Sequence, residues 1–120
     1  MEESEESNFN NIIRKIIKKS LFTERQIEII LNQKNLLESN FSITKGAYYR
    51  QVGQSREKLI GLFYSIIVLR GLGILLPNDI DMISKLSKQV SVINDSDVSP
   101  EREDDVISVI DRLIRQTCSM

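Results

Sequence analysis

The 120-residue sequence contains no histidine and no tryptophan, and it has a single cysteine. Without histidine, the chain lacks the commonest general base and the commonest zinc ligand. Neither a Ser/His nor a Cys/His nucleophile can be assembled, and no glycine-rich phosphate-binding loop occurs. The acidic residues fall in solvated runs rather than singly in apolar surroundings, where a raised pKa would be expected. We therefore predict a protein that is not an enzyme and that uses no cofactor, metal or small-molecule substrate.

Long hydrophobic runs are also missing. No apolar stretch approaches the roughly 20 residues that span a bilayer. The N-terminal segment MEESEESNFN is acidic and polar, and it lacks the basic start and the apolar stretch of a signal peptide. The lone Cys118 cannot form an internal disulfide and has no metal-ligand companions. These features predict a cytoplasmic protein without a membrane partner.

The net charge of −1 conceals a partition along the chain. Residues 1–8 carry four Glu and no base, residues 9–77 carry a net charge of +7, and residues 78–120 carry a net charge of −4. A basic segment attracts polyanions whatever its fold, although charges of this kind also decorate solvated helix faces. The basic middle of the chain is therefore where we look for a binding surface.

Apolar residues recur at helical spacing in most of the chain, and no segment shows the alternation of a convincing strand. We predict an all-α fold, a compact domain of about five helices that begin near residues 9, 23, 44, 77 and 99. Residues 1–8 are predicted to be a disordered acidic tail, ahead of a single helical domain over residues 9–120. That domain would comprise a basic part (9–76) with a helix-turn-helix-like segment and an acidic C-terminal antiparallel helix pair (77–120).

Two helix starts carry clear signals. Thr23 followed by Gln26 predicts a capping box, in which each side chain bonds the backbone amide of the other residue. Ser99 followed by Pro100 predicts an N-cap and a first helical residue. Two other points stay open: residues 35–42 suit either a short helix or a loop, and Gly53 allows either one long helix or a bend.

Two apolar patterns predict buried surface. The stretch from Leu59 to Val68 is apolar on almost all sides, which is typical of a buried helix, and we expect it to be the hub of the core. The C-terminal helices carry stripes that either form the seam of a homodimer or close the core of the monomer. These stripes are Ile83, Leu86, Val90 and Ile93, and Val106, Ile110 and Leu113.

The segment ITKGAYYRQVGQSREKL, residues 43–59, resembles the recognition-helix region of sigma-factor region four and of LuxR-type regulators. The residues TERQ, 23–26, resemble the opening of the first helix in those families. The chain is also similar to small uncharacterised archaeal helix-turn-helix proteins. The stretch from Thr23 to Ile43 is shorter than in the families, so the element is either a shortened helix-turn-helix or an accidental likeness.

The resemblance implies which residues of this segment face inward and which face DNA. Independently of it, Lys, Arg and Gln side chains gathered at one end of a helix suit phosphates and base edges. We expect Arg56 and two lysines of the first helix to add phosphate contacts. The predicted DNA-binding residues are Thr44, Lys45, Tyr49, Arg50, Gln51, Gln54, Arg56, Lys18 and Lys19.

Two functions of different class follow. The first is a DNA-binding protein, either a transcriptional regulator or a chromatin-associated factor, with double-stranded DNA as its partner and a homodimer formed through the C-terminal helices. The second is a non-enzymatic helical module or adaptor that binds other proteins. Affinity for duplex DNA that falls with salt concentration separates the two.

Overall fold

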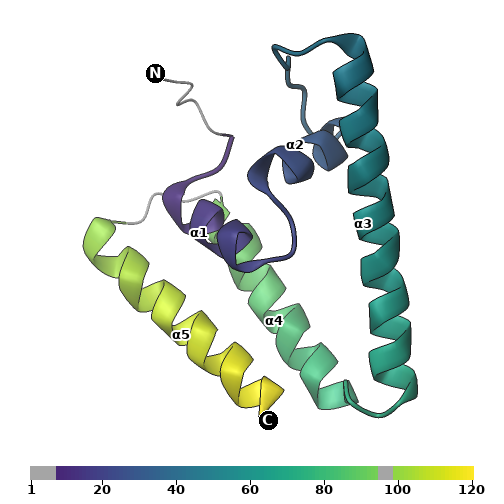
Figure 1. The fold of residues 1–120 in the computed structure, drawn as a ribbon. Helices are drawn as coiled ribbons and strands as arrows, with labels where there is room; N and C mark the ends of the chain where they lie inside the picture. The colour runs from purple at the N-terminus through teal and green to yellow at the C-terminus, as the bar shows by residue number, and fades with distance from the viewer. Residues whose placement is uncertain (1–7, 95–98) are drawn as a thin grey trace. The chain divides into compact units, whose positions relative to one another are not determined.

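The computed structural model describes residues 8–94 and 99–120. Within these residues it contains five α-helices and no strand, so the predicted all-α fold is confirmed (Figure 1). Apart from Asn8, the tail predicted over residues 1–8 lies outside the described residues. The helices are α1 (Asn11–Lys19), α2 (Glu24–Gln33), α3 (Lys45–Gly71), α4 (Pro77–Asn94) and α5 (Pro100–Cys118).

The chain divides into two compact units. A central unit, Ser20–Ile74, contains α2 and α3, which pack against each other. A terminal unit, Met1–Lys19 with Leu75–Met120, contains α4 and α5 together with α1, which packs against both. By sequence the central unit carries a net charge of +3 and the terminal unit −4. None of the described helices has the length and hydropathy needed to cross a bilayer.

Helix α1 forms the apolar centre of the terminal unit. Its residues Ile12, Ile13 and Ile17 are buried, as the helical spacing predicts. Asn10 caps the helix, because its Oδ1 accepts from the amide of Ile13 at 2.9 Å. The same side chain donates from Nδ2 to the carbonyl of Ile93 at 2.8 Å, which joins α1 to the end of α4.

Ion pairs join the basic side of α1 to α5. The ammonium of Lys15 lies 3.4 Å from carboxylate oxygens of both Glu103 and Asp104. These side-chain hydrogen bonds, first to Asp104 and then to Glu103, raise the pKa of Lys15. Lys19 lies 3.7 Å from Asp111. The opposite charges of α1 and α5 therefore meet inside one unit.

In the central unit, α2 starts where the capping box predicts. Thr23 Oγ1 accepts from the amide of Gln26 at 3.1 Å, and Gln26 Oε1 accepts from the amide of Thr23 at 2.9 Å. Residues 34–44 connect α2 to α3 as a loop without a helix, so the open choice at 35–42 is settled as a loop. Asn35 adopts a positive φ of 59° at its start, a conformation that Asn tolerates better than most residues.

Helix α3 runs without interruption past Gly53, so the choice between one helix and two is settled as one. Its first half packs on α2 through Val52 and Ser55, which are buried against a helix whose Ile29 is fully buried. The prediction that residues 59–68 form the hub of the core is wrong for this structure. Phe63, Tyr64 and Ile67 are each more than half exposed.

Candidate nucleic-acid interface

The candidate interface lies on the first four turns of α3, from Lys45 to Lys58. Thr44 starts the helix, since its Oγ1 accepts from the amide of Ala47 at 3.1 Å. Residues 45–58 hold four basic side chains and one acidic one, so they account for the whole net positive charge of the central unit. The N-terminal end of a helix adds the positive end of its dipole to that charge.

Tyr48 holds this part of α3 against α2. Its phenolic oxygen accepts hydrogen bonds from Asn32 Nδ2 and from Gln33 Nε2, each at 2.8 Å. Its ring lies 5.5 Å from the ring of Phe41 in the loop, and the guanidinium of Arg25 lies 5.1 Å above that ring. These contacts orient the start of α3 and tie the loop to both helices.

One side of α3 packs on α2, and the opposite, outward side is broad. Tyr48, Val52, Ser55 and Leu59 follow one another at spacings of three and four, which marks the side that faces α2. Viewed down the helix axis, at 100° per residue, the side that does not face α2 covers about half of the circumference. Lys45 lies at one edge of this arc and Gln54 at the other. Most of the predicted DNA-binding side chains lie exposed on or beside this arc: Thr44, Lys45, Tyr49, Arg50, Gln54 and Arg56.

Tyr49 is the exposed aromatic residue of this surface. It is 57 % exposed, while its ring stands edge-on to that of Tyr48 at a centroid distance of 5.4 Å. The neighbouring tyrosine therefore supports one side of the ring. Its exposed atoms remain available to a base, a sugar or a phosphate.

Gln51 differs from the other predicted residues of α3. Its side chain is half buried, and its Oε1 is buried without a hydrogen-bond partner. Ser55, one turn later, is 1 % exposed and its hydroxyl is also without a partner. Both polar atoms lie on or beside the side of α3 that faces α2. Sequence position alone places Gln51 with the DNA-facing set, whereas its burial places it near the inner side.

The two predicted lysines of α1 belong to the other unit. Lys18 and Lys19 are exposed near the end of α1 in the terminal unit, and Lys19 pairs with Asp111. The structure therefore groups seven of the nine predicted residues in the central unit, where Thr44 caps α3 and the other six lie on it. It does not group the two lysines with them.

A shallow hollow surrounds Gly53 on the outward side of α3. It is lined by Tyr49, Arg50 and Gln54 and also by Arg56, Glu57 and Lys58. A Cβ added at Gly53 would meet no atom within 4 Å, so nothing inside the protein requires a glycine here. A glycine in a helix interior costs about 1 kcal/mol relative to alanine, and its absent side chain lets another backbone approach closely.

Lys58 is a basic residue outside the predicted DNA-binding set. Its ammonium lies 3.1 Å from Gln26 Oε1 and 5.8 Å from the centre of the Phe22 ring. It therefore joins the capping region of α2 to the edge of the candidate interface. The signal that could have identified it is its position one turn after Gln54, at a spacing of four.

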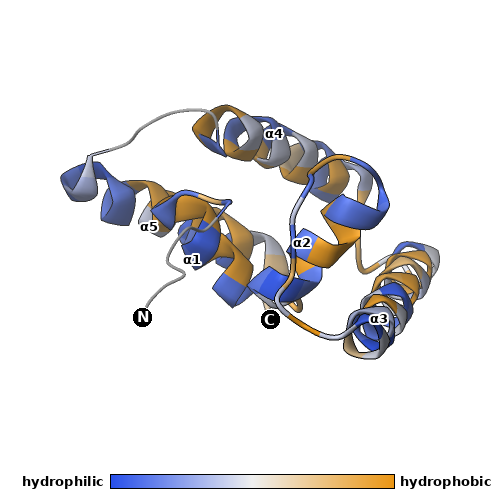
Figure 2. Ribbon diagram, turned by 90° about the horizontal axis from the view of Figure 1, so that it is seen from above, coloured by the Kyte–Doolittle hydropathy of each residue, from blue (hydrophilic) through white to orange (hydrophobic). Residues whose placement is uncertain are grey.

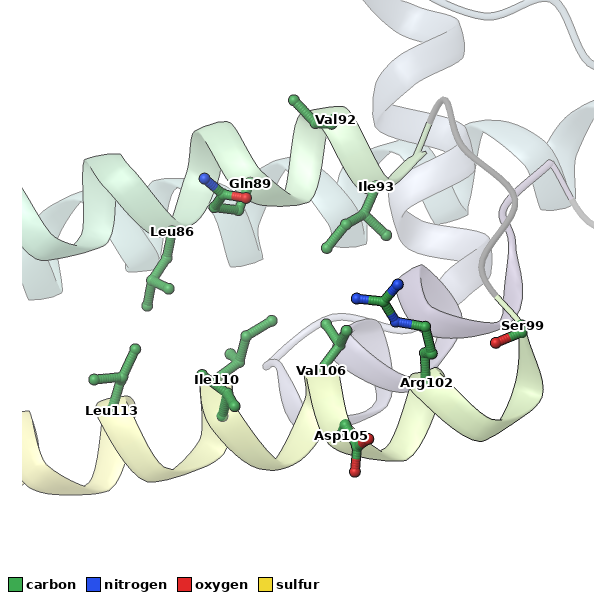
Figure 3. Close-up of a pocket in the computed structure, with 11 residues that line it drawn as sticks. Leu86, Gln89, Val92, Ile93, Ser99, Arg102, Asp105, Val106, Ile110 and Leu113 are labelled. Carbon is green, nitrogen blue, oxygen red and sulfur yellow. The ribbon is translucent and has the colours of Figure 1, made fainter.

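A second hollow lies within the terminal unit, between α4 and α5. These helices run antiparallel, and apolar side chains from both point toward each other across an open groove of about 920 Å³ (Figure 3). Its polar lining includes Arg102, whose guanidinium extends into the groove beside Val106 and Ile93. The predicted stripe of α5 lines this groove, and so do Leu86 and Ile93 of the predicted α4 stripe, whereas Ile83 and Val90 are not part of its lining.

In the part of the chain that the structure describes, no three Cys, Asp or Glu side chains come together as a metal site would need. No family of proteins, no characterised protein and no solved structure matches the chain. The geometry and the charge of the surface are therefore what indicate the function.

Proposed function

We propose that the central unit binds double-stranded DNA through the outward side of α3, from Lys45 to Arg56. The protein would act in the cytoplasm as a transcriptional regulator or a chromatin-associated factor. The observation that carries this proposal is the exposure of Lys45, Arg50 and Arg56 on the same half of a helix whose other half packs on α2.

The side chains suit both parts of DNA recognition. Lys45 and Arg56 are placed to neutralise phosphates, which supplies affinity without sequence preference. Arg50 and Gln54, one turn apart, have the donors and acceptors that pair with guanine and adenine in the major groove, at roughly 1–3 kcal/mol of discrimination for each bidentate pair. An α-helix fits that groove, and the bare backbone at Gly53 permits close approach.

The anchoring of α3 supports the same function. A helix that reads base edges has to be held in a fixed orientation, because the hydrogen bonds to bases are directional. Tyr48 supplies that hold through Asn32 and Gln33, and the capping box fixes the start of α2. In this arrangement α2 supports α3, and a loop over residues 34–44 connects the two helices.

The test is fluorescence anisotropy with a labelled random duplex over a series of salt concentrations. Two phosphate contacts, from Lys45 and Arg56, predict that log Kobs falls with log salt at a slope of about −2, since each contact contributes about −0.9. Absence of binding to any duplex at about 50 mM salt, where phosphate contacts are strong, would contradict the proposal.

Two matched variants locate the surface. Arg50→Ala is expected to weaken binding and to reduce discrimination between duplexes selected from a genomic library and random ones. Arg112→Ala removes the same charge from an exposed position on α5 in the terminal unit, and we expect affinity to change less than twofold. Equal losses from both variants would show that binding reflects overall charge rather than this side of α3.

The alternative function is a helical module that binds other proteins. The observation that favours it is the group of exposed apolar side chains on the second half of α3, which includes Phe63, Tyr64 and Ile67. Exposed apolar surface of this kind marks protein contacts more often than nucleic-acid contacts. Failure to bind DNA, combined with capture of a protein partner through these residues, would select this alternative.

A further inference from the structure

A small hollow, which we call the inner hollow, lies between α2 and α3 within the central unit. Its volume is about 150 Å³. Both helices carry hydrophobic and hydrophilic residues (Figure 2), and hydrophobic residues of both meet at this hollow. An apolar cavity of about 150 Å³ is large enough for a benzene ring. The apolar part of the lining consists of four branched aliphatic side chains, Ile29, Ile30, Val52 and Leu59.

Ser55 adds a polar group to this apolar lining. Its side chain is 1 % exposed, and its hydroxyl has no hydrogen-bond partner. At exposed helix positions, Ser65 and Ser87 donate instead to the carbonyl four residues before, each at 2.8 Å. The Ser55 hydroxyl is not engaged by its own helix in this way, so it is able to donate to a bound molecule. A buried polar group without a partner costs stability, and a ligand that accepts from it offsets that cost.

Two cations complete the lining of the inner hollow. Lys34, which follows the end of α2, and Arg56, next to Ser55 on α3, both border it. No acidic residue lines the hollow, and neither cation forms an ion pair with a residue that the structure describes. Both side chains are exposed, so they lie at its mouth rather than in its apolar part. A mouth with two unpaired positive charges attracts an anion.

We propose that the inner hollow binds a small carboxylate with an apolar body, such as an aromatic acid. The body packs between the four aliphatic side chains, and the carboxylate lies between Ser55 and the two cations. One carboxylate oxygen accepts from the Ser55 hydroxyl, and the other accepts from the guanidinium of Arg56, whose planar shape suits a carboxylate. Lys34 supplies a second positive charge from the side of α2.

Other ligands fit this lining less well. A duplex on the outward side of α3 cannot reach Ser55, which is buried on the side that faces α2. Inorganic phosphate has no apolar part and would leave the aliphatic side chains without a partner. A neutral aromatic molecule would leave both cations unpaired. A carboxylate with an apolar body uses the aliphatic lining, the hydroxyl and the charges together.

Arg56 connects the inner hollow with the surface proposed to bind DNA. It also lines the shallow hollow around Gly53 on the outward side of α3. A carboxylate that pairs with Arg56 withdraws this guanidinium from a DNA phosphate, so the ligand lowers the affinity for duplex DNA. This regulatory step rests on the proposed function, whereas the binding of the carboxylate does not.

The first experiment is an NMR titration of the full chain with benzoate. We expect saturable binding, with intermolecular NOEs from the ring protons to the methyl groups of Ile30 and Leu59. Acetate lacks the ring and benzyl alcohol lacks the charge, so each is expected to bind at least about tenfold more weakly. Absence of saturable benzoate binding overturns the proposal. So do NOEs that connect benzoate only to Val106 and Ile110, in the groove between α4 and α5.

Matched variants test the groups that hold the carboxylate. Ser55→Ala and Lys34→Gln are each expected to weaken benzoate binding about tenfold, because each removes a hydrogen bond or a charge from the anion. Ser65→Ala and Lys85→Gln make the same changes at exposed positions outside the hollow and are expected to alter it less than about twofold. Wild-type affinity in the Ser55→Ala variant overturns the proposal, since the hydroxyl then does not contact the ligand.

A second experiment tests the regulatory step. With saturating benzoate and matched sodium, the slope of log Kobs for duplex DNA against log salt is expected to change from about −2 to about −1, because one phosphate contact is lost. Arg56→Ala is expected to show a slope of about −1 with and without benzoate. An unchanged slope in the wild type, with benzoate bound, overturns the regulatory step. Benzoate binding by a chain that binds no duplex overturns the proposed function and supports the carboxylate site.

Discussion

Tyr48, on the first turns of α3, accepts a hydrogen bond from the side-chain amide of Asn32, near the end of α2, over 2.8 Å. Asn32 is also linked to the loop between the two helices, since its Oδ1 accepts from the amide of Ser39 at 3.4 Å. One asparagine thus connects the end of α2, the loop and the start of α3. The orientation of the candidate interface depends on this small group of polar contacts.

Tyr48→Phe tests that connection. The variant keeps the ring against Phe41 but removes the oxygen that accepts from Asn32 and Gln33. We expect the free energy of unfolding, measured in urea, to fall by about 1 kcal/mol. Tyr49→Phe is the matched control, because Tyr49 is 57 % exposed and its hydroxyl can be hydrated in the unfolded and folded states alike. Losses of the same size in both variants would contradict the assigned role of Tyr48.

Ser55→Ala is expected to stabilise the protein. The hydroxyl of Ser55 is buried without a partner, and an unsatisfied buried polar group costs about 1–3 kcal/mol. Ser65→Ala is the control, since Ser65 is exposed and its hydroxyl donates to the carbonyl of Gly61 at 2.8 Å. Both substitutions raise helix propensity by the same amount. The additional rise in unfolding free energy for Ser55→Ala over Ser65→Ala, about 1 kcal/mol, therefore measures the cost of burying the unpaired hydroxyl. A destabilised Ser55→Ala variant would show that the hydroxyl has a partner in solution.

Gly53→Ala separates stability from binding. A Cβ at this position meets nothing within 4 Å, so we expect the unfolding free energy to rise by about 1 kcal/mol. If DNA approaches the backbone at Gly53, the same change lowers the affinity for duplex DNA severalfold. Gly61→Ala also meets open space and is the control: it should stabilise by a similar amount and leave DNA affinity within twofold. Equal DNA affinity for wild type and Gly53→Ala would argue against close approach there.

Acid should weaken the terminal unit through Asp111. The hydrogen bond from Arg115 Nε, 2.8 Å long, lowers the pKa of the Asp111 carboxyl below its usual 3.8. A lowered pKa in the folded state stabilises the protein above pH 3.8, and that contribution is lost as the pH falls through the folded-state pKa. Asp111→Asn should therefore show a shallower loss of stability below pH 3.8 than the wild type, with a small difference because the pair is near the surface. Parallel pH profiles of denaturant unfolding for the two proteins would contradict this prediction.

Local signals in the sequence predicted the helices well. The capping box at Thr23 and Gln26, the start of α3 after Thr44 and the start of α5 at Pro100 all agree with the structure. Each of these depends on hydrogen bonds or backbone preferences within a few residues, which the order of side chains determines directly. The side of α3 that faces α2 was predictable for the same reason, since Val52 and Ser55 fall at helical spacing.

The partners of the helices could not be predicted in the same way. Exposure of the apolar side chains from Leu59 to Val68 to water is unfavourable, but their pattern does not identify the surface that covers them. Likewise, Lys19 of α1 is predicted from the sequence to contact DNA, but the packing of α5 on α1 brings Asp111 within 3.7 Å of its ammonium. Gln51 is a third case, because the side to which a long amide turns depends on packing rather than on spacing.

Helix α3 carries a polar surface and an apolar surface on one unbroken rod of 27 residues, about 40 Å long. A rod of this kind acts as a lever. A rotation of about 10° at Phe63 moves a point 21 Å away, at Tyr49, by nearly 4 Å, which exceeds the length of a hydrogen bond. A contact that turns the apolar end of α3 would therefore displace the polar end by more than one hydrogen-bond length, so the two surfaces of this helix are mechanically coupled.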